Sequence, residues 1–558
     1  MNHSIYIWLL GLCIVISACE KHPWKEFDRI NSSLPNANLR AQFNINDNAC
    51  LVPCDPMFEN TSINALEYEW YFGNGDNATD ENPSYVYEQP GVYEVMLIAK
   101  NFALADTAIQ SLIIQDEALL PIANFDVDNN NCLVPCNPML INSSINTDSI
   151  RWDLGNGLSS NLDEPGQIYD LPGDYEVKLL AYGNNAVDSI TKTISIIAPI
   201  TFEKTYLVDP NNRYVGGAVL QLEDDGYMIT GYNSSDNASY MLRVDDSGNT
   251  QIDKHYGNGG AYSLTTLNAQ EYLITGFNLN LTQGFGTAYI LRVNGIFDQL
   301  QAFSFDQGGD RFYTVAKQAS NNELLMGGRI GTTSQVTAAI LRMDANFNTD
   351  TILYTDYTQV FDLIITSDNR CSFICRNEAQ QLFLVKTNAD YSSIAWVLPL
   401  PTYQIPDLKD SDHLLIEDDN GDYIIVGYAP SGNLGQQDAT LIKVSSNGQQ
   451  RWQKYYGGAL NDQGASVQNT ADGGLILLGS TESFSSGGKD VYLVKTDEEG
   501  AVLWERTYGG LDIDFGTSVK QTRDGGFILT GGTQKNEVGG IRDQIYLIKT
   551  ASNGQIYE

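Results

Sequence analysis

Short apolar runs, each preceded by a polar turn, are the main pattern along this chain. Leu475–Leu478 follows an Asp-Gly-Gly turn, and Phe527–Leu529 follows a second one. Runs of this length, bounded by Gly, Asp and Asn, predict β-strands. Composition agrees, because 50 Gly, 31 Tyr and only 18% charged residues exclude a coiled coil, collagen and a largely disordered chain. We therefore predict an all-β protein, and its 558 residues indicate several domains.

From residue 201 onward the pattern repeats with a period of about 51 residues. A small residue after the second predicted strand recurs at Gly231, Gly276, Gly327, Cys375, Gly427, Gly479 and Gly531. A basic residue in the third strand recurs at Arg243, Arg292, Arg342, Lys386, Lys443, Lys495 and Lys549. Four short strands repeated seven times predict a seven-bladed β-propeller over residues 201–558.

The two ends of this region predict how the propeller closes. The last repeat stops before its fourth strand is complete, whereas Phe202–Tyr206 matches the fourth strand of an earlier repeat, Trp504–Tyr508. We expect Phe202–Tyr206 to lie beside the strand at Tyr546–Thr550 and to complete the last blade, which leaves only short edges. An open solenoid is the alternative.

These repeats resemble the secreted bacterial propeller repeats with Asp-Gly-Gly-Phe, Tyr-Leu-Ile-Lys-Thr and Trp-x-Lys-x-Tyr-Gly-Gly signatures. The resemblance is clearest in the last three repeats and weakest around Cys371. There, Cys371 and Cys375 lie in an apolar strand and are expected to be reduced, buried thiols. The resemblance implies a fold, but the biochemical roles of such repeats are mostly undefined.

A tandem duplication with an offset of 82 residues precedes the propeller region. The matching positions include Trp70 and Trp152, Gly73 and Gly155, and Tyr93 and Tyr175. Several strands joined by Pro-Gly and similar turns predict a β-sandwich for each copy. The motif resembles the PKD domain, an immunoglobulin-like extracellular module, although the second copy has Leu154 and Glu164 where the first has Phe and Asn. The resemblance implies PKD-like domains at 41–118 and 119–200 that act as spacers or contact proteins and glycans.

Each copy also carries two cysteines four residues apart, with a proline between them. On an extended strand their Cα atoms would lie about 13 Å apart, whereas a disulfide needs a separation below about 7 Å. In an exported and oxidising setting we expect the prolines to lie in turns. We therefore predict that Cys50 pairs with Cys54 and that Cys132 pairs with Cys136. A metal site is the alternative and needs two more ligands in each copy.

The first 18 residues predict a secretory leader. Ile5–Ala18 is an apolar run of 14 residues, too short for a spanning helix of about 20. It ends in Ile-Ser-Ala before Cys19, which resembles the bacterial lipobox, although the leader lacks Lys and Arg. The resemblance implies a lipoprotein signal peptide at 1–18, a lipid on Cys19 and a tether at 19–40. We expect an outer-membrane protein anchored by lipid at the cell surface, with the periplasmic face or ordinary cleavage beside an incidental Cys as alternatives.

The net charge and the small number of histidines argue against several classes of partner and ligand. The 69 Asp and Glu against 32 Lys and Arg give a net charge of −37, which opposes binding to nucleic acid. Only four His are present, and two of them lie at or near the leader, so a multi-His zinc site is excluded. The acidic turns at 126–128, 418–422 and 512–514 offer oxygen ligands, so calcium binding is possible but no metal is assigned.

Candidate chemistry is sparse. The recurring Lys or Arg is expected to bridge neighbouring blades and to pair with an acid or a carbonyl. A nucleophile elbow, a phosphate loop and a dinucleotide fingerprint all need a strand followed by a helix, so no catalytic residue and no cofactor are assigned. Carboxylate pairs for glycan chemistry remain open, because many of the 69 acids could converge.

We therefore expect a membrane-anchored extracytoplasmic binding or scaffold protein, in which the PKD-like modules form a stalk and the propeller binds a protein or a glycan. Loops between the second and third strands are long and variable, so the binding face is predicted on that side. Its candidate residues are Asp310, Asp462, Asp490, Asp514 and Asp543. The recurring Asp could instead fix the connection between blades. A glycan lyase or hydrolase and a subunit of a surface polymer-uptake or secretion complex are the alternative functions.

Overall fold

A computed structural model describes residues 39–557, apart from 47–48, 103, 117–119, 207–213, 234–237, 259, 281–284, 306–310, 318–322, 333–334, 345, 407–412, 431–433 and 538–539. The described residues form 42 strands, and the protein is all-β, as predicted. Within these ranges no helix is long and apolar enough to cross a membrane. Contacts divide the chain into two compact units, and the larger one includes Ile194–Glu558.

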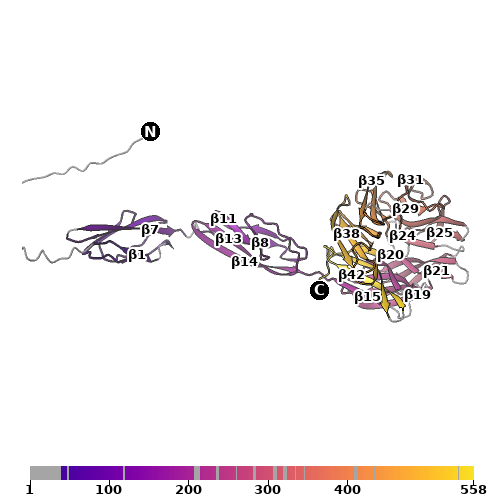
Figure 1. The fold of residues 1–558 in the computed structure, drawn as a ribbon, viewed down its shortest axis with the longest axis horizontal. Helices are drawn as coiled ribbons and strands as arrows, with labels where there is room; N and C mark the ends of the chain where they lie inside the picture. The colour runs from indigo at the N-terminus through magenta and orange to yellow at the C-terminus, as the bar shows by residue number, and fades with distance from the viewer. Residues whose placement is uncertain are drawn as a thin grey trace, which may run out of the picture. The chain divides into compact units, whose positions relative to one another are not determined.

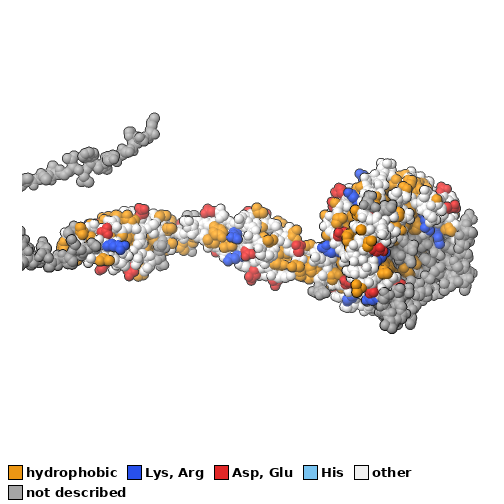
Figure 2. Space-filling model, in the orientation of Figure 1, with side chains coloured by type: hydrophobic (Ala, Val, Ile, Leu, Met, Phe, Trp, Pro, Cys, Tyr) orange, Lys and Arg blue, Asp and Glu red, His pale blue; other side chains and the backbone are white. Residues whose placement is uncertain are grey.

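Two β-sandwich modules with the same sheet order form the N-terminal part (Figure 1). The first pairs β1 with β3 and has a second sheet in the order β2-β7-β6-β4-β5, and the second pairs β8 with β10 and has a sheet in the order β9-β14-β13-β11-β12. Hydrophobic and charged side chains are both spread over the visible surface of the modules (Figure 2). The strands are β1 (Phe43–Asn46), β2 (Ala49–Leu51), β3 (Met57–Asn60), β4 (Glu67–Tyr71), β5 (Asn77–Ala78), β6 (Gly91–Lys100), β7 (Ala105–Gln115), β8 (Phe125–Asp128), β9 (Asn131–Leu133), β10 (Met139–Asn142), β11 (Ser149–Asp153), β12 (Ser159–Ser160), β13 (Gly173–Gly183) and β14 (Ala186–Ile197).

The Trp of the duplicated motif forms the centre of the first module. Trp70 is fully buried, its ring lies 4.9 Å from that of Phe43, and its Nε1 donates to the Asp80 carbonyl oxygen at 3.0 Å. Gly73 follows β4 with φ +82°, and a Cβ there would lie 2.9 Å from the backbone of Glu94. The position therefore needs glycine, which explains the first glycine of the motif.

Both predicted disulfides are present. Cys50 is bonded to Cys54 and Cys132 to Cys136, with Cα atoms 5.9 Å apart in each pair. The peptide bond before the intervening proline is cis in both modules. Each bridge therefore closes a short turn within one module, and the prediction of local pairing is confirmed.

Seven four-stranded antiparallel sheets make up the head, as the C-terminal part is called below (Figure 1). In chain order they are β16 (Tyr214–Gln221), β17 (Tyr227–Asn233), β18 (Ala238–Val244) and β19 (Thr250–Asn258); β20 (Gly260–Asn268), β21 (Glu271–Asn280), β22 (Phe285–Asn294) and β23 (Gln299–Phe305); β24 (Arg311–Lys317), β25 (Leu324–Thr332), β26 (Gln335–Met343) and β27 (Thr349–Tyr354); β28 (Gln359–Ile365), β29 (Cys371–Arg376), β30 (Leu382–Thr387) and β31 (Ile394–Leu400); β32 (Leu415–Glu417), β33 (Tyr423–Ala429), β34 (Asp438–Val444) and β35 (Gln450–Tyr456); β36 (Asp462–Asn469), β37 (Leu475–Thr481), β38 (Asp490–Thr496) and β39 (Val502–Tyr508); and β40 (Ile513–Gln521), β41 (Phe527–Glu537) and β42 (Gly540–Thr550) with β15 (Phe202–Tyr206).

Contacts between the sheets follow chain order. The first strand of each sheet contacts the first strand of the next, and β40 of the last sheet contacts β16 of the first. The outer strand of the last sheet comes from the start of the head: β15 pairs antiparallel with β42, with Phe202 opposite Lys549 and Tyr206 opposite Ile545. This pairing was predicted from the incomplete last repeat and is confirmed. The architecture is propeller-like, with apolar second and third strands buried between neighbouring sheets.

One repeat lacks the glycine that recurs in the second strand of the other repeats. Cys375 occupies that position in β29, and Cys371 begins the same strand. Both thiols are free and buried, as expected for an apolar strand without a turn between them. Burial raises the pKa of the Cys371 thiol, first through desolvation and then through the nearby Asp362 carboxylate. These cysteines therefore serve the core of their sheet.

Candidate functional site

The recurring cation of the third strand pairs with an acid near the start of the second strand of the same sheet. The pairs are Arg243–Asp224, Arg292–Glu271, Arg342–Glu323, Lys386–Asp368, Lys443–Asp418, Lys495–Asp472 and Lys549–Asp524. The expected pairing with an acid is confirmed, and the acid belongs to the same sheet because the third strand lies beside the second and places both side chains at one end of the sheet. This end, which we call the turn face, therefore carries a repeated structural pair. The expected bridge to a neighbouring sheet is present at Arg243, whose Nη1 donates to the carbonyl oxygen of Gly295.

The Lys549–Asp524 pair shows how such a pair is balanced. Burial alone would raise the pKa of Asp524, but hydrogen bonds from Lys549 and Thr522 outweigh it and lower that pKa. Burial lowers the pKa of Lys549, and the Asp524 carboxylate partly offsets this. Both charges thus have a partner, and neither is directed to a ligand.

The opposite end of the sheets, the loop face, carries Asp462, Asp490, Asp514 and Asp543, the predicted aspartates that the structure describes. Asp462 is fully buried, and its Oδ2 accepts hydrogen bonds from Gly458 N at 2.8 Å and Ser483 Oγ at 2.7 Å. Asp514 is also buried, and its Oδ2 accepts from Gly510 N at 3.1 Å. Both carboxylates thus fasten the chain that enters the next sheet. The recurring Asp therefore has the alternative role considered in the sequence analysis, which is to fix the connection between neighbouring sheets.

The other three candidates differ from one another. Asp490 is buried and its Oδ2 accepts from Ser486 N at 2.9 Å, so it holds the loop between β37 and β38. Burial raises the pKa of Asp490, the hydrogen bond from Ser486 opposes this, and the nearby Asp514 carboxylate adds to it. Asp543 lines a cavity, and Asp310 lies outside the described residues. Cys19 also lies outside them.

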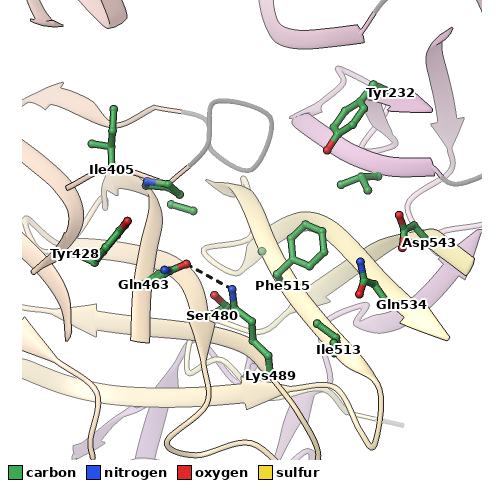
Figure 3. Close-up of a pocket in the computed structure, with 14 residues that line it drawn as sticks. Tyr232, Ile405, Tyr428, Gln463, Ser480, Lys489, Ile513, Phe515, Gln534 and Asp543 are labelled. Carbon is green, nitrogen blue, oxygen red and sulfur yellow. Dashed lines mark hydrogen bonds between the residues drawn. The ribbon is translucent and has the colours of Figure 1, made fainter. Parts of the chain in front are cut away.

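A cavity of about 440 Å³ opens on the loop face (Figure 3). Its aromatic lining is Tyr232 of β17, Tyr428 of β33 and Phe515 of β40. Side chains that can donate or accept hydrogen bonds lie among these rings, and they are Gln463, Ser480, Lys489, Gln534 and Asp543. Apolar side chains complete the lining, namely Val215, Ile405, Pro406, Ala465 and Ile513.

The polar groups of the cavity are held by neighbours. Lys489 Nζ lies 3.5 Å from Gln463 Oε1, as Figure 3 shows, and Gln463 Nε2 donates to Gln437 Oε1 at 2.7 Å. Gln534 and Asp543 face each other on the paired strands β41 and β42. Amide, ammonium and carboxylate groups on rigid strands beside aromatic rings suit a ligand with both apolar faces and hydrogen-bonding groups.

Several lining residues occupy repeat positions next to the recurring glycines. Val215, Gln463 and Phe515 each precede a glycine of the first strand, while Tyr232, Tyr428 and Ser480 each follow the glycine of the second strand. A Cβ at Gly479 would lie 1.8 Å from the Gln463 carbonyl oxygen, so the glycines let these strands approach closely. Sequence reasoning missed these residues, although a comparison of the variable positions beside the repeated glycines could have found them.

Metal ligands are sparse in the described part of the chain, which contains no group of three or more His, Cys, Asp or Glu arranged to hold an ion. The acidic turn at 418–422 is used internally: Asp418 Oδ2 pairs with Lys443 at 2.7 Å, and Asp422 Oδ2 pairs with Arg451 at 2.6 Å. Cations of the protein therefore take the oxygens that were considered for calcium in this turn.

Comparison with known proteins gives one family match and several similar solved structures. The family model of the PKD domain matches residues 33–113. The PKD1 domain of the metalloprotease PrtV from Vibrio cholerae is 28% identical over 14% of this chain and 96% of that chain, with a TM-score of 0.13. A quinoprotein alcohol dehydrogenase-like protein from Bacteroides thetaiotaomicron is 11% identical over 70% of this chain and 97% of its own, with a TM-score of 0.34.

The β-propeller domain of the Trilobed protease from Pyrococcus furiosus is 9% identical over 53% of this chain and 91% of that chain, with a TM-score of 0.32. The family match therefore assigns a PKD domain to residues 33–113 of the chain.

Proposed function

We propose that this protein is a lipid-anchored extracytoplasmic binding protein whose head takes up a ligand in the cavity of the loop face. The observation that carries the proposal is the cavity itself, where Tyr232, Tyr428 and Phe515 surround polar groups on rigid strands. Concave sites of this composition are the usual ligand sites of folded proteins.

We further propose that the seven sheets are the blades of one closed seven-bladed propeller. The contact of β40 with β16 and the pairing of β15 with β42 support this arrangement. The two sandwich modules then act as a stalk of two PKD-type domains. The equal sheet order of the second module and its disulfide at the same offset support its assignment to the same type.

The lining favours a glycan as the ligand. Sugar rings offer C–H faces that pack on aromatic rings, and their hydroxyls pair with the amides of Gln463 and Gln534. A protein segment is the other ligand class that these groups can bind. Hydrolysis of a glycosidic bond needs two carboxyl groups, and Asp543 is the one carboxylate among the described lining residues. Binding is therefore the function that the cavity supports best.

A glycan array probed with the soluble protein tests this proposal. We expect binding to a restricted set of glycans, and at least a tenfold loss in the Phe515→Ala variant, because truncation removes an aromatic surface at the centre of a binding site. Glu498→Ala is the matched control, since Glu498 is exposed in the turn before β39 and lies on the turn face. Equal loss in both variants, or retention of glycan binding in Phe515→Ala, would contradict the cavity as the site.

A pull-down from intact cells separates the remaining alternatives. Capture of a defined protein that Phe515→Ala abolishes would assign the cavity to a protein partner, as in a polymer-uptake or secretion complex. Release of shortened products from a bound glycan would instead establish an enzyme.

The proposed anchor is tested separately. Membrane fractionation should place the wild-type protein with membranes, while Cys19→Ala should give unprocessed or untethered protein. Retention of processed Cys19→Ala in the membrane fraction, at the wild-type level, would contradict a lipid on Cys19.

A further inference from the structure

One end of the first sandwich module exposes four large apolar side chains, and three of these positions are not large apolar residues in the second module, whose equivalent end exposes Ile122, Ile145 and Val187 instead. Phe102 is 97% exposed, and Leu66, Leu104 and Ile63 are 60%, 55% and 51% exposed. Large apolar side chains that are scattered over a surface need no explanation, whereas a group of them at one place marks an interaction site. We call Ile63, Leu66, Phe102 and Leu104 the apolar tip.

Hydrogen bonds show that these residues lie together. The connection after β3 and the connection after β6 meet where Asn101 Nδ2 donates to the Asn64 carbonyl oxygen at 3.2 Å. Asn101 N also donates to the Leu104 carbonyl oxygen at 3.0 Å, and Leu66 N donates to that of Lys100 at 2.8 Å. The two connections therefore form one end of the sandwich.

The duplicated module provides an internal comparison. At an offset of 82 residues, Leu66 corresponds to Asp148, Phe102 to Asn184 and Leu104 to Ala186, while Ile63 keeps an apolar counterpart. The second module has the same sheet order with these residues. Apolar side chains at the three positions are therefore not needed for the fold, and their exposure in the first module needs another reason.

The tip also lies where the chain enters the first module. Arg40 pairs with Ile63 of the tip, with Ile63 N donating to the Arg40 carbonyl oxygen at 2.9 Å. Arg40 is 21 residues after Cys19. A chain of that length reaches at most about 70 Å, so a lipid on Cys19 would keep the tip near the bilayer at a high effective concentration.

We propose that the apolar tip inserts into the lipid surface that holds the Cys19 anchor, as a second contact of the protein with the membrane. The inference rests on the proposed lipid anchor for its location. Insertion of a few apolar side chains at the interface gives reversible binding, which would add a second, protein-borne contact to that of the lipid.

Binding to vesicles tests the tip without the anchor. The probe is the mature chain with Cys19→Ser, mixed with phosphatidylethanolamine and phosphatidylglycerol vesicles and sedimented. The matched variant carries the residues of the second module, Leu66→Asp, Phe102→Asn and Leu104→Ala. We expect the wild-type tip to bind and the variant to lose at least about tenfold in partitioning, because burial of three apolar side chains is removed.

A fluorescent probe locates the contact. An environment-sensitive dye on Phe102→Cys should become brighter with vesicles, while the same dye on Asn184→Cys, the equivalent position of the second module, should not change. Equal vesicle binding by wild type and variant, or no binding by either, would overturn the proposal. Self-association of the wild type that the variant abolishes would also overturn it, because a second copy would then be the occupant. None of these results depends on whether Cys19 carries lipid, so failure of the tip and failure of the anchor are distinguishable.

Discussion

The turn face and the loop face of the head are built from the same seven sheets but differ in what they repeat. On the turn face each sheet carries a cation and an acid in the same place, from Arg243–Asp224 to Lys549–Asp524. On the loop face the equivalent positions differ from sheet to sheet, and Tyr232, Tyr428 and Ser480 occupy one such position. Repetition therefore marks the residues that build the sheets, and variation marks the residues available to a ligand.

The repeated aspartates of the loop face also belong to the framework of the sheets. Asp462 and Asp514 recur at the start of their sheets and are buried with backbone partners, like the pairs of the turn face. They share the loop face with the cavity but belong to its framework. Position on a face is therefore a weaker guide to function than departure from the repeat.

The largest effect is expected from removal of β15, the strand that completes the last sheet and so helps to hold the two faces in place. A chain that starts at residue 208 lacks β15 and leaves β42 as an unpaired edge, so it should aggregate. A chain that starts at residue 200 keeps this strand and should stay soluble and monomeric. Size-exclusion chromatography and light scattering compare the two, and equal behaviour would indicate an open array of sheets.

A large effect is also expected from one pair on the turn face. The side chains of Lys443 and Asp418 are 10% and 11% exposed, so Lys443→Met leaves a buried carboxylate without its cation. We expect a loss of about 3 kcal/mol in the free energy of unfolding of the head, measured by calorimetry and urea denaturation.

The control is the exposed Lys254–Asp298 pair, with side chains 40% and 58% exposed. Lys254→Met should cost less than about 1 kcal/mol, because solvent screens such a pair. A similar cost for both substitutions would show that the repeated pairs are not special to the fold.

Much of the architecture could be predicted from sequence because repetition supplies its own comparison. The seven copies of the third-strand cation gave the number of sheets, and the match of Phe202–Tyr206 to Trp504–Tyr508 gave the pairing of β15 with β42. The local disulfides followed from spacing and the geometry of an extended chain. Each of these features can be inferred either from residues close together in the sequence or by comparing one repeat with another.

The cavity could not be predicted in the same way because its lining comes from separate sheets. Tyr232 and Tyr428 are far apart in sequence, and only the arrangement of the sheets places them around one space with Phe515. The acids chosen as candidates were the repeated ones, and repetition selected framework residues such as Asp462. Among the described candidates Asp543 alone lines the cavity.

The smallest effect separates the two faces by their pH dependence. Burial raises the pKa of Asp490 on the loop face, so its contribution to stability is present below the unfolded pKa and is lost as the pH rises through the folded pKa. Asp490→Asn keeps an acceptor for Ser486 N and should gain stability relative to wild type as the pH rises above the unfolded pKa of the carboxyl group. On the turn face the hydrogen bonds from Lys549 and Thr522 outweigh burial and lower the pKa of Asp524, so its contribution is present above the unfolded pKa and is lost as the pH falls. Asp524→Asn should therefore lose stability at pH 7 and approach wild type at low pH. Urea denaturation at several pH values measures both slopes, and slopes of the same sign would show that the two carboxylates are not held in opposite ways.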